Sequence, residues 1–165
     1  MGQVVDFDTL LKLRAEWKAG GKTVVFTNGC FDLLHVGHIR SIQDAADLGD
    51  LLIVGLNSDA SVRRLKGPGR PLQNEASRGA VVAAIRGVDY VLFFDEPTAD
   101  GVLKTLQPDI HAKGTDYSQE SVPERDTVLA YGGRIVITGD PKNHSTKDLI
   151  RDIKARYAPG ESSPR

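Results

Sequence analysis

Two histidines with a glycine between them form the pattern His35-Val36-Gly37-His38. Imidazoles three residues apart at the start of a helix face the same side, and Gly37 lets a ligand approach the backbone closely. The first N–H groups of a helix are unpaired and therefore bind anions. The pattern predicts that His35 and His38 donate hydrogen bonds to a phosphate group on which charge develops during a reaction.

Incidental packing and zinc binding account for these histidines less well. Packing would not explain why two of the 4 His in the chain stand together here, after an apolar run. Cys30 and Asp32 could join the histidines around zinc, yet the spacing Cys-x4-His-x2-His fits no structural zinc site and there is no second cysteine.

Two other segments resemble nucleotide-binding motifs but do not match them. Residues 21–23 resemble the end of a P-loop but precede a strand, and residues 67–69 lack the third glycine of a dinucleotide fingerprint.

The elements that must position the histidines follow from hydrophobic periodicity. Strands are expected at 23–27, 51–56, 90–94, 110–113 and 134–137. Helices are expected at 8–17, 39–48, 75–85, 99–106, 123–131 and 146–157. Continuous apolar strands between helices predict an α/β fold, a Rossmann-like doubly wound parallel sheet of about five strands with helices on both faces.

The chain is expected to form a single domain over residues 1–157, with an N-terminal helix at about 7–19, a core at about 22–157 and a disordered tail at 158–165. Residues 67–71 are expected to be a mobile loop. Ligands bind such a sheet at the carboxyl ends of its strands, near the switch point. The first core strand runs directly into residues 28–38, which places that segment where chemistry is expected.

The composition agrees with one soluble domain. The chain has 165 residues, a net charge of −1 and 40% hydrophobic residues, which suffices for a core of its own. The balance of charges argues against a surface that binds nucleic acid or an anionic membrane. Residues 1–13 lack the apolar segment of a signal peptide and no apolar run could span a membrane, so a cytoplasmic protein is expected.

Residues 27–32 and 35–38 resemble the catalytic loop of the cytidylyltransferase-like superfamily of nucleotidyltransferases. Other segments resemble its branch that adenylylates heptose phosphates, and they occur in order over residues 20–155: 54–62, 64–67, 70–71, 88–91, 108–110, 113–117, 132–133 and 145–146. The chain departs from that branch at Thr115, at Lys147 and at Cys30, where glycine, threonine and valine are common.

The resemblance implies roles for the matching residues. Catalysis would fall to His35, His38 and Lys66, with Lys66 closing over the triphosphate from a glycine-flanked mobile segment. The nucleotide would be bound by Asn28, Gly29, Cys30, Phe31, Gly37, Lys113, Gly114, Asp116, Ser145 and Thr146. The second substrate would be bound by Asp32, Asp59, Arg70 and Arg78, and Asp32 is also the candidate for a contact with the metal.

These roles have ordinary structural alternatives. Most lysines are solvated, so Lys66 could be a plain surface residue. Carboxylates and hydroxyls at the ends of strands and starts of helices often cap helices, which applies to Asp32, Asp59, Ser145 and Thr146. Arg78 could form a surface ion pair with Glu75.

The implied reaction transfers AMP from ATP to D-glycero-D-manno-heptose 1-phosphate and releases pyrophosphate, with Mg²⁺ bridging the phosphates. A sugar phosphate is largely dianionic and needs no general base, so catalysis would consist of positioning and charge stabilisation. The alternatives are a cytidylyltransferase for glycerol 3-phosphate or a similar alcohol phosphate, and a non-catalytic nucleotide-binding module. The resemblance also implies a homodimer and a sugar kinase, expected on a separate chain because only about twenty residues precede the first strand.

Overall fold

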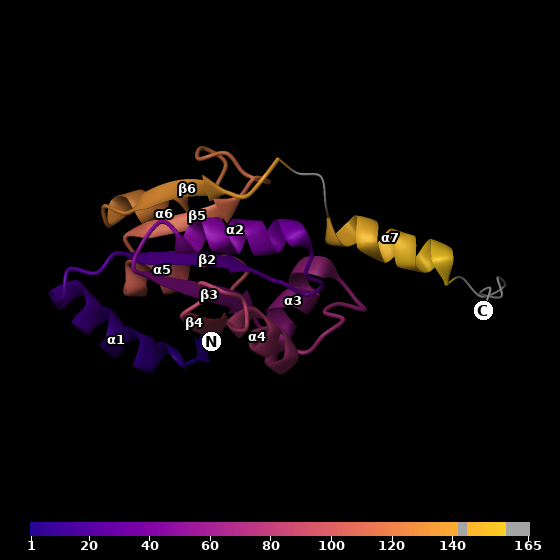
Figure 1. Ribbon diagram of the computed structural model, residues 1–165, viewed down its shortest axis with the longest axis horizontal. Helices are drawn as coiled ribbons and strands as arrows, with labels where there is room; N and C mark the ends of the chain where they lie inside the picture. The colour runs from indigo at the N-terminus through magenta and orange to yellow at the C-terminus, as the bar shows by residue number, and fades with distance from the viewer. Residues whose placement is uncertain (142–144, 158–165) are drawn as a thin grey trace.

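The computed structural model describes residues 1–141 and 145–157 of the chain. Helices and strands alternate along it almost throughout (Figure 1). Their bounds are β1 Gln3–Val4, α1 Phe7–Ala19, β2 Val24–Gly29, α2 Val36–Ala46, β3 Leu51–Asn57, α3 Asp59–Lys66, α4 Glu75–Ala83, β4 Tyr90–Phe94, α5 Asp100–Leu106, β5 Ile110–Gly114, α6 Arg125–Ala130, β6 Arg134–Thr138 and α7 Thr146–Arg156.

The strands form one sheet in the order β1-β4-β3-β2-β5-β6, and all neighbours are parallel. The predicted doubly wound parallel sheet is confirmed, with six strands instead of about five. The additional strand, β1, pairs with β4 at one edge of the sheet. It has two residues, which are too few to show a hydrophobic period in the sequence. Strand β2 lies between β3 and β5, so the chain winds away from it in both directions and the switch point lies at its carboxyl end.

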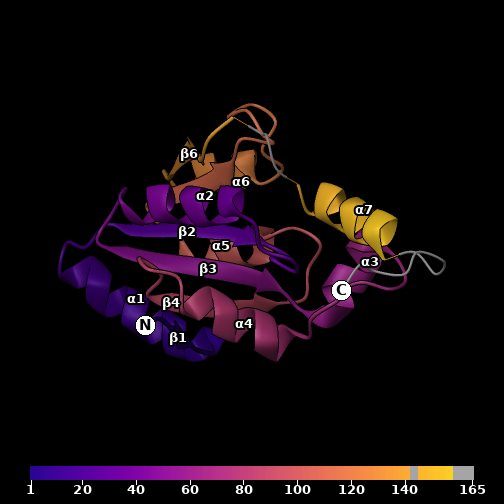
Figure 2. The same cartoon turned by 45° about the vertical axis from the view of Figure 1, so that its right-hand side comes forward.

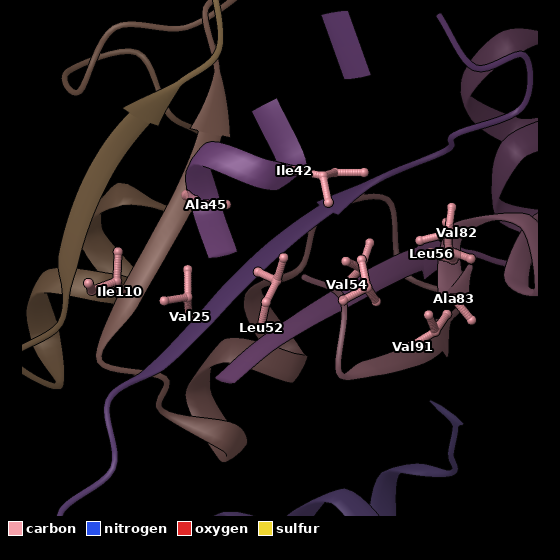
Figure 3. Close-up of a cluster of buried hydrophobic side chains, with 12 residues drawn as sticks. Val25, Ile42, Ala45, Leu52, Val54, Leu56, Val82, Ala83, Val91 and Ile110 are labelled. Atoms are coloured by element: carbon pink, nitrogen blue, oxygen red, sulfur yellow. The ribbon is translucent and has the colours of Figure 1, made fainter. Parts of the chain in front are cut away.

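Two apolar clusters fill the space between the sheet and its helices. The one in Figure 3 joins α2 and α4 to one face, through side chains such as Ile42, Val82 and Val54. The other joins α1, α5 and α6 to the opposite face. Neighbouring residues of β2 alternate between them, since Val25 belongs to the first cluster and Phe26 to the second. This alternation decides which residues at the end of β2 face which side of the molecule.

A helix that the sequence pattern did not predict lies between β3 and the glycine-rich segment. Ser58 starts α3 by accepting a hydrogen bond from the backbone N–H of Ser61, and Gly67, with φ of 87°, ends it. Lys66 was expected within a mobile segment but is the last residue of this helix. The helix therefore fixes the direction in which the side chain of Lys66 leaves the backbone.

Helix α7 lies beyond the carboxyl ends of the strands, on the side of α3 (Figures 1 and 2). None of the residues of α7 is buried, and Leu149 and Ile153 expose apolar side chains to solvent. The tail expected to be disordered, 158–165, lies outside the described residues. Within the described parts of the chain, no helix is long and apolar enough to cross a membrane.

Candidate active site

A pocket of about 430 Å³ opens at the carboxyl ends of the strands, beside the start of α2. The predicted site residues that line it are His35, His38, Lys66, Cys30, Phe31, Gly37, Gly114, Asp116, Ser145, Thr146, Asp32 and Arg70. The predicted site residues that do not line it are Asn28, Gly29, Lys113, Asp59 and Arg78. The structure therefore brings all three expected catalytic residues together and separates part of the expected binding set from them.

The two histidines stack against each other at the start of α2. His35 is the residue before the first turn, its ring centroid lies 3.8 Å from that of His38, and the ring planes differ by 28°. Nδ1 of His38 accepts a hydrogen bond from the backbone N–H of His35 at 3.3 Å. The proton of a neutral His38 must then be on Nε2, which makes Nε2 a hydrogen-bond donor.

The surroundings keep His38 neutral. Burial and, after it, the neighbouring His35 lower the pKa of His38 from 6.5 to about 4, although Asp116 acts in the opposite direction. The ring of Phe31 stands edge-on to His38 with centroids 5.4 Å apart. At neutral pH the site thus presents an oriented N–H donor without a full positive charge.

Gly37 leaves room for the ring of His35. A Cβ atom at residue 37 would lie 3.1 Å from both Cε1 and Nδ1 of His35. Alanine is nevertheless favoured over glycine within helices by about 1 kcal/mol. We expect Gly37→Ala to lower kcat by about 10–100-fold, as a displaced catalytic group does, while the Tm stays unchanged or rises.

Steady-state kinetics and thermal unfolding check this expectation together. Gly101→Ala in α5 is the matched control, because there a Cβ would meet only the flexible side chain of Glu96. A Gly37→Ala protein with unchanged kcat would show that the ring of His35 tolerates displacement.

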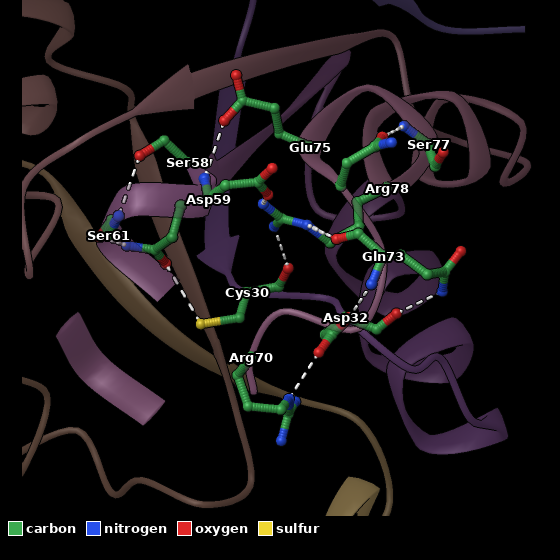
Figure 4. Close-up of polar contacts among 12 residues, drawn as sticks. Cys30, Asp32, Ser58, Asp59, Ser61, Arg70, Gln73, Glu75, Ser77 and Arg78 are labelled. Carbon is green, nitrogen blue, oxygen red and sulfur yellow. Dashed lines mark hydrogen bonds and ion pairs between the residues drawn. The ribbon is translucent and has the colours of Figure 1, made fainter. Parts of the chain in front are cut away.

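Asp32 joins the catalytic loop to the segment that follows α3 (Figure 4). Its carboxylate accepts hydrogen bonds from the backbone N–H groups of Leu72 and Gln73 at 2.8–2.9 Å and from Nε of Arg70 at 2.7 Å. Burial by itself would raise the pKa of Asp32, but these donors outweigh it and hold the pKa below its ordinary value. Contacts of this carboxylate with substrate or metal stay predictions, and its observed partners favour a role in holding the loop.

Lys66 and Arg70 reach the pocket from the two ends of a short glycine-rich segment. Gly67 and Gly69 between them have φ of 87° and 82°, and a Cβ atom added at either position would meet none of the described residues within 4 Å. These positive φ values suit glycine far better than other residues. Lys66 is exposed at the pocket, whereas Arg70 is held by Asp32.

Arg78 is buried behind the pocket, with 1% of its surface exposed. Its guanidinium donates to the carbonyl oxygen of Cys30 at 2.6 Å, to that of Gln73 at 3.1 Å and to Oδ1 of Asp59 at 2.8 Å (Figure 4). Glu75, the alternative partner, instead accepts from the backbone N–H of Asp59. Substrate contacts of Arg78 and Asp59 stay predictions, and the geometry favours a structural connection between the catalytic loop, α3 and α4.

Helix α7 contributes its first turn to the pocket. Oγ of Ser145 accepts from the backbone N–H of Asp148 at 3.1 Å, and Oγ1 of Thr146 donates to the carbonyl oxygen of Leu33 at 3.0 Å. The capping role that was the alternative for Ser145 is thus present. Thr146 attaches the helix to the catalytic loop.

Sequence reasoning missed one wall of the pocket, formed by Ser41, Thr138, Gly139, Asp140 and Pro141. Hydroxyl groups of Ser41 and Thr138 lie 2.9 Å apart, and Asp140 pairs with Arg40. Two signals were available. Ser41 is one helical turn after His38, and residues 138–141 follow the carboxyl end of a strand that was predicted.

Asn28 and Lys113 lie on the α5 and α6 side of the sheet, in a buried polar cluster with His111 and Glu124. Burial, and secondarily Lys113, lowers the pKa of His111 from 6.5 to about 3. Burial likewise lowers the pKa of Lys113, and the nearby Glu124 opposes it.

The lowered pKa values of His38 and His111 predict a loss of stability in acid. In the unfolded chain both histidines bind a proton near pH 6.5. In the folded protein His38 binds its proton only near pH 4 and His111 only near pH 3. The stability contributed by the neutral rings is complete above pH 6.5 and decreases as the pH falls through this window. At pH 5 the free energy of unfolding should be about 2 kcal/mol lower per histidine than at pH 7.5. Urea unfolding at the two pH values measures this, and His111→Gln should remove about half of the difference.

No group of three or more His, Cys, Asp or Glu side chains in residues 1–141 and 145–157 is arranged to hold a metal ion. Asp116 and Asp140 are the carboxylates that line the pocket besides Asp32. Mg²⁺ is commonly held by one or two carboxylates together with substrate phosphates, and this donor set fits that arrangement.

Comparison with known proteins agrees with the geometry. A family model described as cytidylyltransferase-like matches residues 26–157. The bifunctional protein HldE of Syntrophotalea carbinolica is 48% identical over 163 residues, covering 94% of this chain and 33% of its own length. The HldE protein of Citrifermentans bemidjiense is 50% identical over 155 residues, covering 94% and 32%. The chain thus spans about a third of the length of these relatives.

Two solved structures are also similar. The lipopolysaccharide core biosynthesis protein from Thermoplasma volcanium has a TM-score of 0.63 and 27% identity, covering 74% of this chain and 100% of its own. Pantoate-beta-alanine ligase from Francisella tularensis has a TM-score of 0.63 at 14% identity, covering 93% and 77%, and shows the fold alone. With the family model matching most of its length and a stacked histidine pair at the switch point, the chain belongs to the cytidylyltransferase-like family of nucleotidyltransferases.

Proposed function

We propose that the protein transfers AMP from ATP to a sugar 1-phosphate, D-glycero-D-manno-heptose 1-phosphate, to give ADP-heptose and pyrophosphate. The observation that carries the nucleotidyl transfer is the stacked pair His35 and His38, of which His38 is held neutral, set at a helix start in a pocket that also receives Lys66. Such donors bind an α-phosphate more strongly as its negative charge increases in the transition state.

In the proposed reaction a phosphate oxygen of the acceptor attacks the α-phosphorus of ATP, and the bond from the α-phosphorus to the oxygen of the departing pyrophosphate breaks. The Nε2–H of His38 would stabilise the α-phosphate oxygens, with His35 beside it. Lys66 would neutralise the bridging region, and the first turn of α7, with Ser145 and Thr146, would bind the pyrophosphate. Because the acceptor is already a dianion, no protein base is required.

A divalent cation, Mg²⁺ in this proposal, would neutralise part of the charge of the phosphates. Asp116 is the protein carboxylate best placed to approach it, since it lines the pocket and interacts electrostatically with His38. Asp32 is engaged by the loop at 70–73. Chelation of divalent cations is therefore expected to stop turnover.

The heptose assignment rests on resemblance. The segments around Asn57, Lys66 and Lys113 resemble the heptose branch, two similar relatives are bifunctional HldE proteins, and a solved relative is a lipopolysaccharide core biosynthesis protein. A homodimer and a sugar kinase as a partner belong to the same proposal.

Pyrophosphate release tests the proposal directly. The protein is incubated with ATP or CTP, and with heptose 1-phosphate or glycerol 3-phosphate, in the presence of Mg²⁺. We expect turnover with ATP and the heptose phosphate. Turnover only with CTP and glycerol 3-phosphate would replace the proposed substrates, and binding of ATP without turnover of any pair would indicate a non-catalytic module.

A further inference from the structure

The side-chain amide of Asn28, next to the last residue of β2, is held in one orientation by two buried donors. Its Oδ1 lies 2.9 Å from Nζ of Lys113 and 3.0 Å from Nε2 of His111. An ammonium group has only donors, so the amide atom that faces Lys113 must be the oxygen. Nε2 of His111 must therefore carry its proton and donate to the same oxygen.

The two donors are themselves fixed. His111 is fully buried and Lys113 is 6% exposed. Nζ of Lys113 lies 3.3 Å from Oε2 of Glu124, which is 2% exposed, and Oε1 of Glu124 accepts from the backbone N–H of Ala99. These contacts restrict the alternative arrangements of the network, although Nδ1 of His111 and Oε2 of Glu124 are buried without a hydrogen bond among the described residues. It leaves the amide of Asn28 little freedom to flip.

The nitrogen of this amide is directed away from the network. Nδ2 of Asn28 makes no hydrogen bond within residues 1–141 and 145–157, and it is not among their buried unpaired atoms, so it is open to solvent. Asn28 alternates with Thr27 along β2 and lies on the same face as Phe26, the α5 and α6 side. The pocket beside α2 does not include it.

We infer that Asn28 is a specificity residue that binds an oxygen of the sugar phosphate acceptor through Nδ2, and that Lys113 and His111 are positioning residues that orient it. This inference rests on the proposed function. The pocket beside α2 contains the groups assigned to the triphosphate. In-line displacement requires the acceptor to approach the α-phosphorus from the side opposite the pyrophosphate. Asn28 provides oriented donors at the switch point, outside the pocket that contains the groups assigned to the triphosphate.

The test compares the KM for the acceptor with the KM for ATP. Asn28→Asp keeps an oxygen for Lys113 and His111 but replaces the donor by a second carboxylate oxygen, which repels a phosphate. We expect it to raise the KM for heptose 1-phosphate at least about 10-fold, as loss of a hydrogen bond to a charged group does, and to change the KM for ATP less than twofold. Equal changes in both KM values, or in neither, would overturn the inference.

Separate variants test whether Lys113 orients the amide of Asn28. Lys113→Met should also raise the acceptor KM selectively, and Lys113→Arg should restore part of it. Because Lys113→Met leaves Glu124 buried without its partner, the double variant Lys113→Met/Glu124→Gln keeps the test available if the single variant does not fold. Lys104→Met is the matched control, since Lys104 is an exposed lysine of α5. Normal acceptor KM in a folded variant without Lys113 would exclude positioning.

A second readout separates this inference from the proposed function. In the ¹⁵N–¹H spectrum of the wild-type protein, the Asn28 NH2 signals should shift when heptose 1-phosphate is added together with a non-hydrolysable ATP analogue, and not with the analogue alone. This response does not require turnover. If the spectrum is unaffected by the sugar phosphate, the role of Asn28 is refuted even where pyrophosphate release confirms the reaction.

Discussion

Replacing His38 with asparagine should lower kcat by about 10²–10³-fold, the usual cost of removing one preorganised donor to a developing oxyanion, while the Tm changes little. The reason is that the two ring nitrogens have different roles. Nδ1 accepts from the backbone N–H of His35 and secures the start of α2, and Nε2 is left as the donor. Asparagine can place an acceptor near Nδ1 but has no group at the position of Nε2.

His38→Gln is the matched variant, because glutamine can present an N–H near the position of Nε2 but no acceptor near Nδ1. It should retain more activity than His38→Asn and lose more thermal stability. Single-turnover kinetics and thermal unfolding distinguish the two. If both variants lose activity in proportion to their loss of stability, His38 acts by holding α2 and not by contacting the phosphate.

Arg78→Met should lower the free energy of unfolding by about 3–5 kcal/mol, the cost of removing one partner from a buried ion pair. The variant leaves the carboxylate of Asp59 and the carbonyl oxygens of Cys30 and Gln73 without their donor. Arg78→Lys should recover only a minor part, because an ammonium cannot reproduce the planar arrangement of three donated bonds. Urea unfolding monitored by circular dichroism measures both.

Arg86→Met is the control for Arg78, since Arg86 is exposed just after the same helix and should change stability by less than about 0.5 kcal/mol. A loss below about 1 kcal/mol for Arg78→Met would mean that water replaces the guanidinium easily. The catalytic loop would then have to be held mainly by Asp32.

Most of the architecture could be predicted because parallel sheets covered on both faces produce continuous apolar strands. The helix expected at 146–157 ends one residue earlier, and that expected at 75–85 ends two residues earlier. β1 was missed because two residues carry no period. α3 was missed because its eight residues contain three basic side chains and only two buried ones, which leaves no apolar helical pattern. The main sign of this helix in the sequence is Ser58, which can cap its start.

The site could be predicted as a region but not as a set of contacts. His35 and His38 were found because their spacing itself describes a geometry. By contrast, Asn28 and Arg78 were selected by their place in a motif, and the sequence does not tell whether such a side chain meets a ligand or a neighbouring loop. The side chain of Arg78 is engaged by Cys30 and Asp59, which lie 48 and 19 residues away in the chain. The sequence does not show that these residues are its neighbours.

Helix α7 brings Ser145 and Thr146 to the pocket although none of its own residues is buried in the fold. A helix with so few buried contacts loses conformational freedom when a ligand binds to its first turn. The entropy lost in this way weakens the affinity for that ligand. In the proposed reaction the substrate and the product share an adenosine, so tight retention of the nucleotide would delay every cycle. In that reaction, the weak packing of α7 against the fold would favour a short residence time of the product.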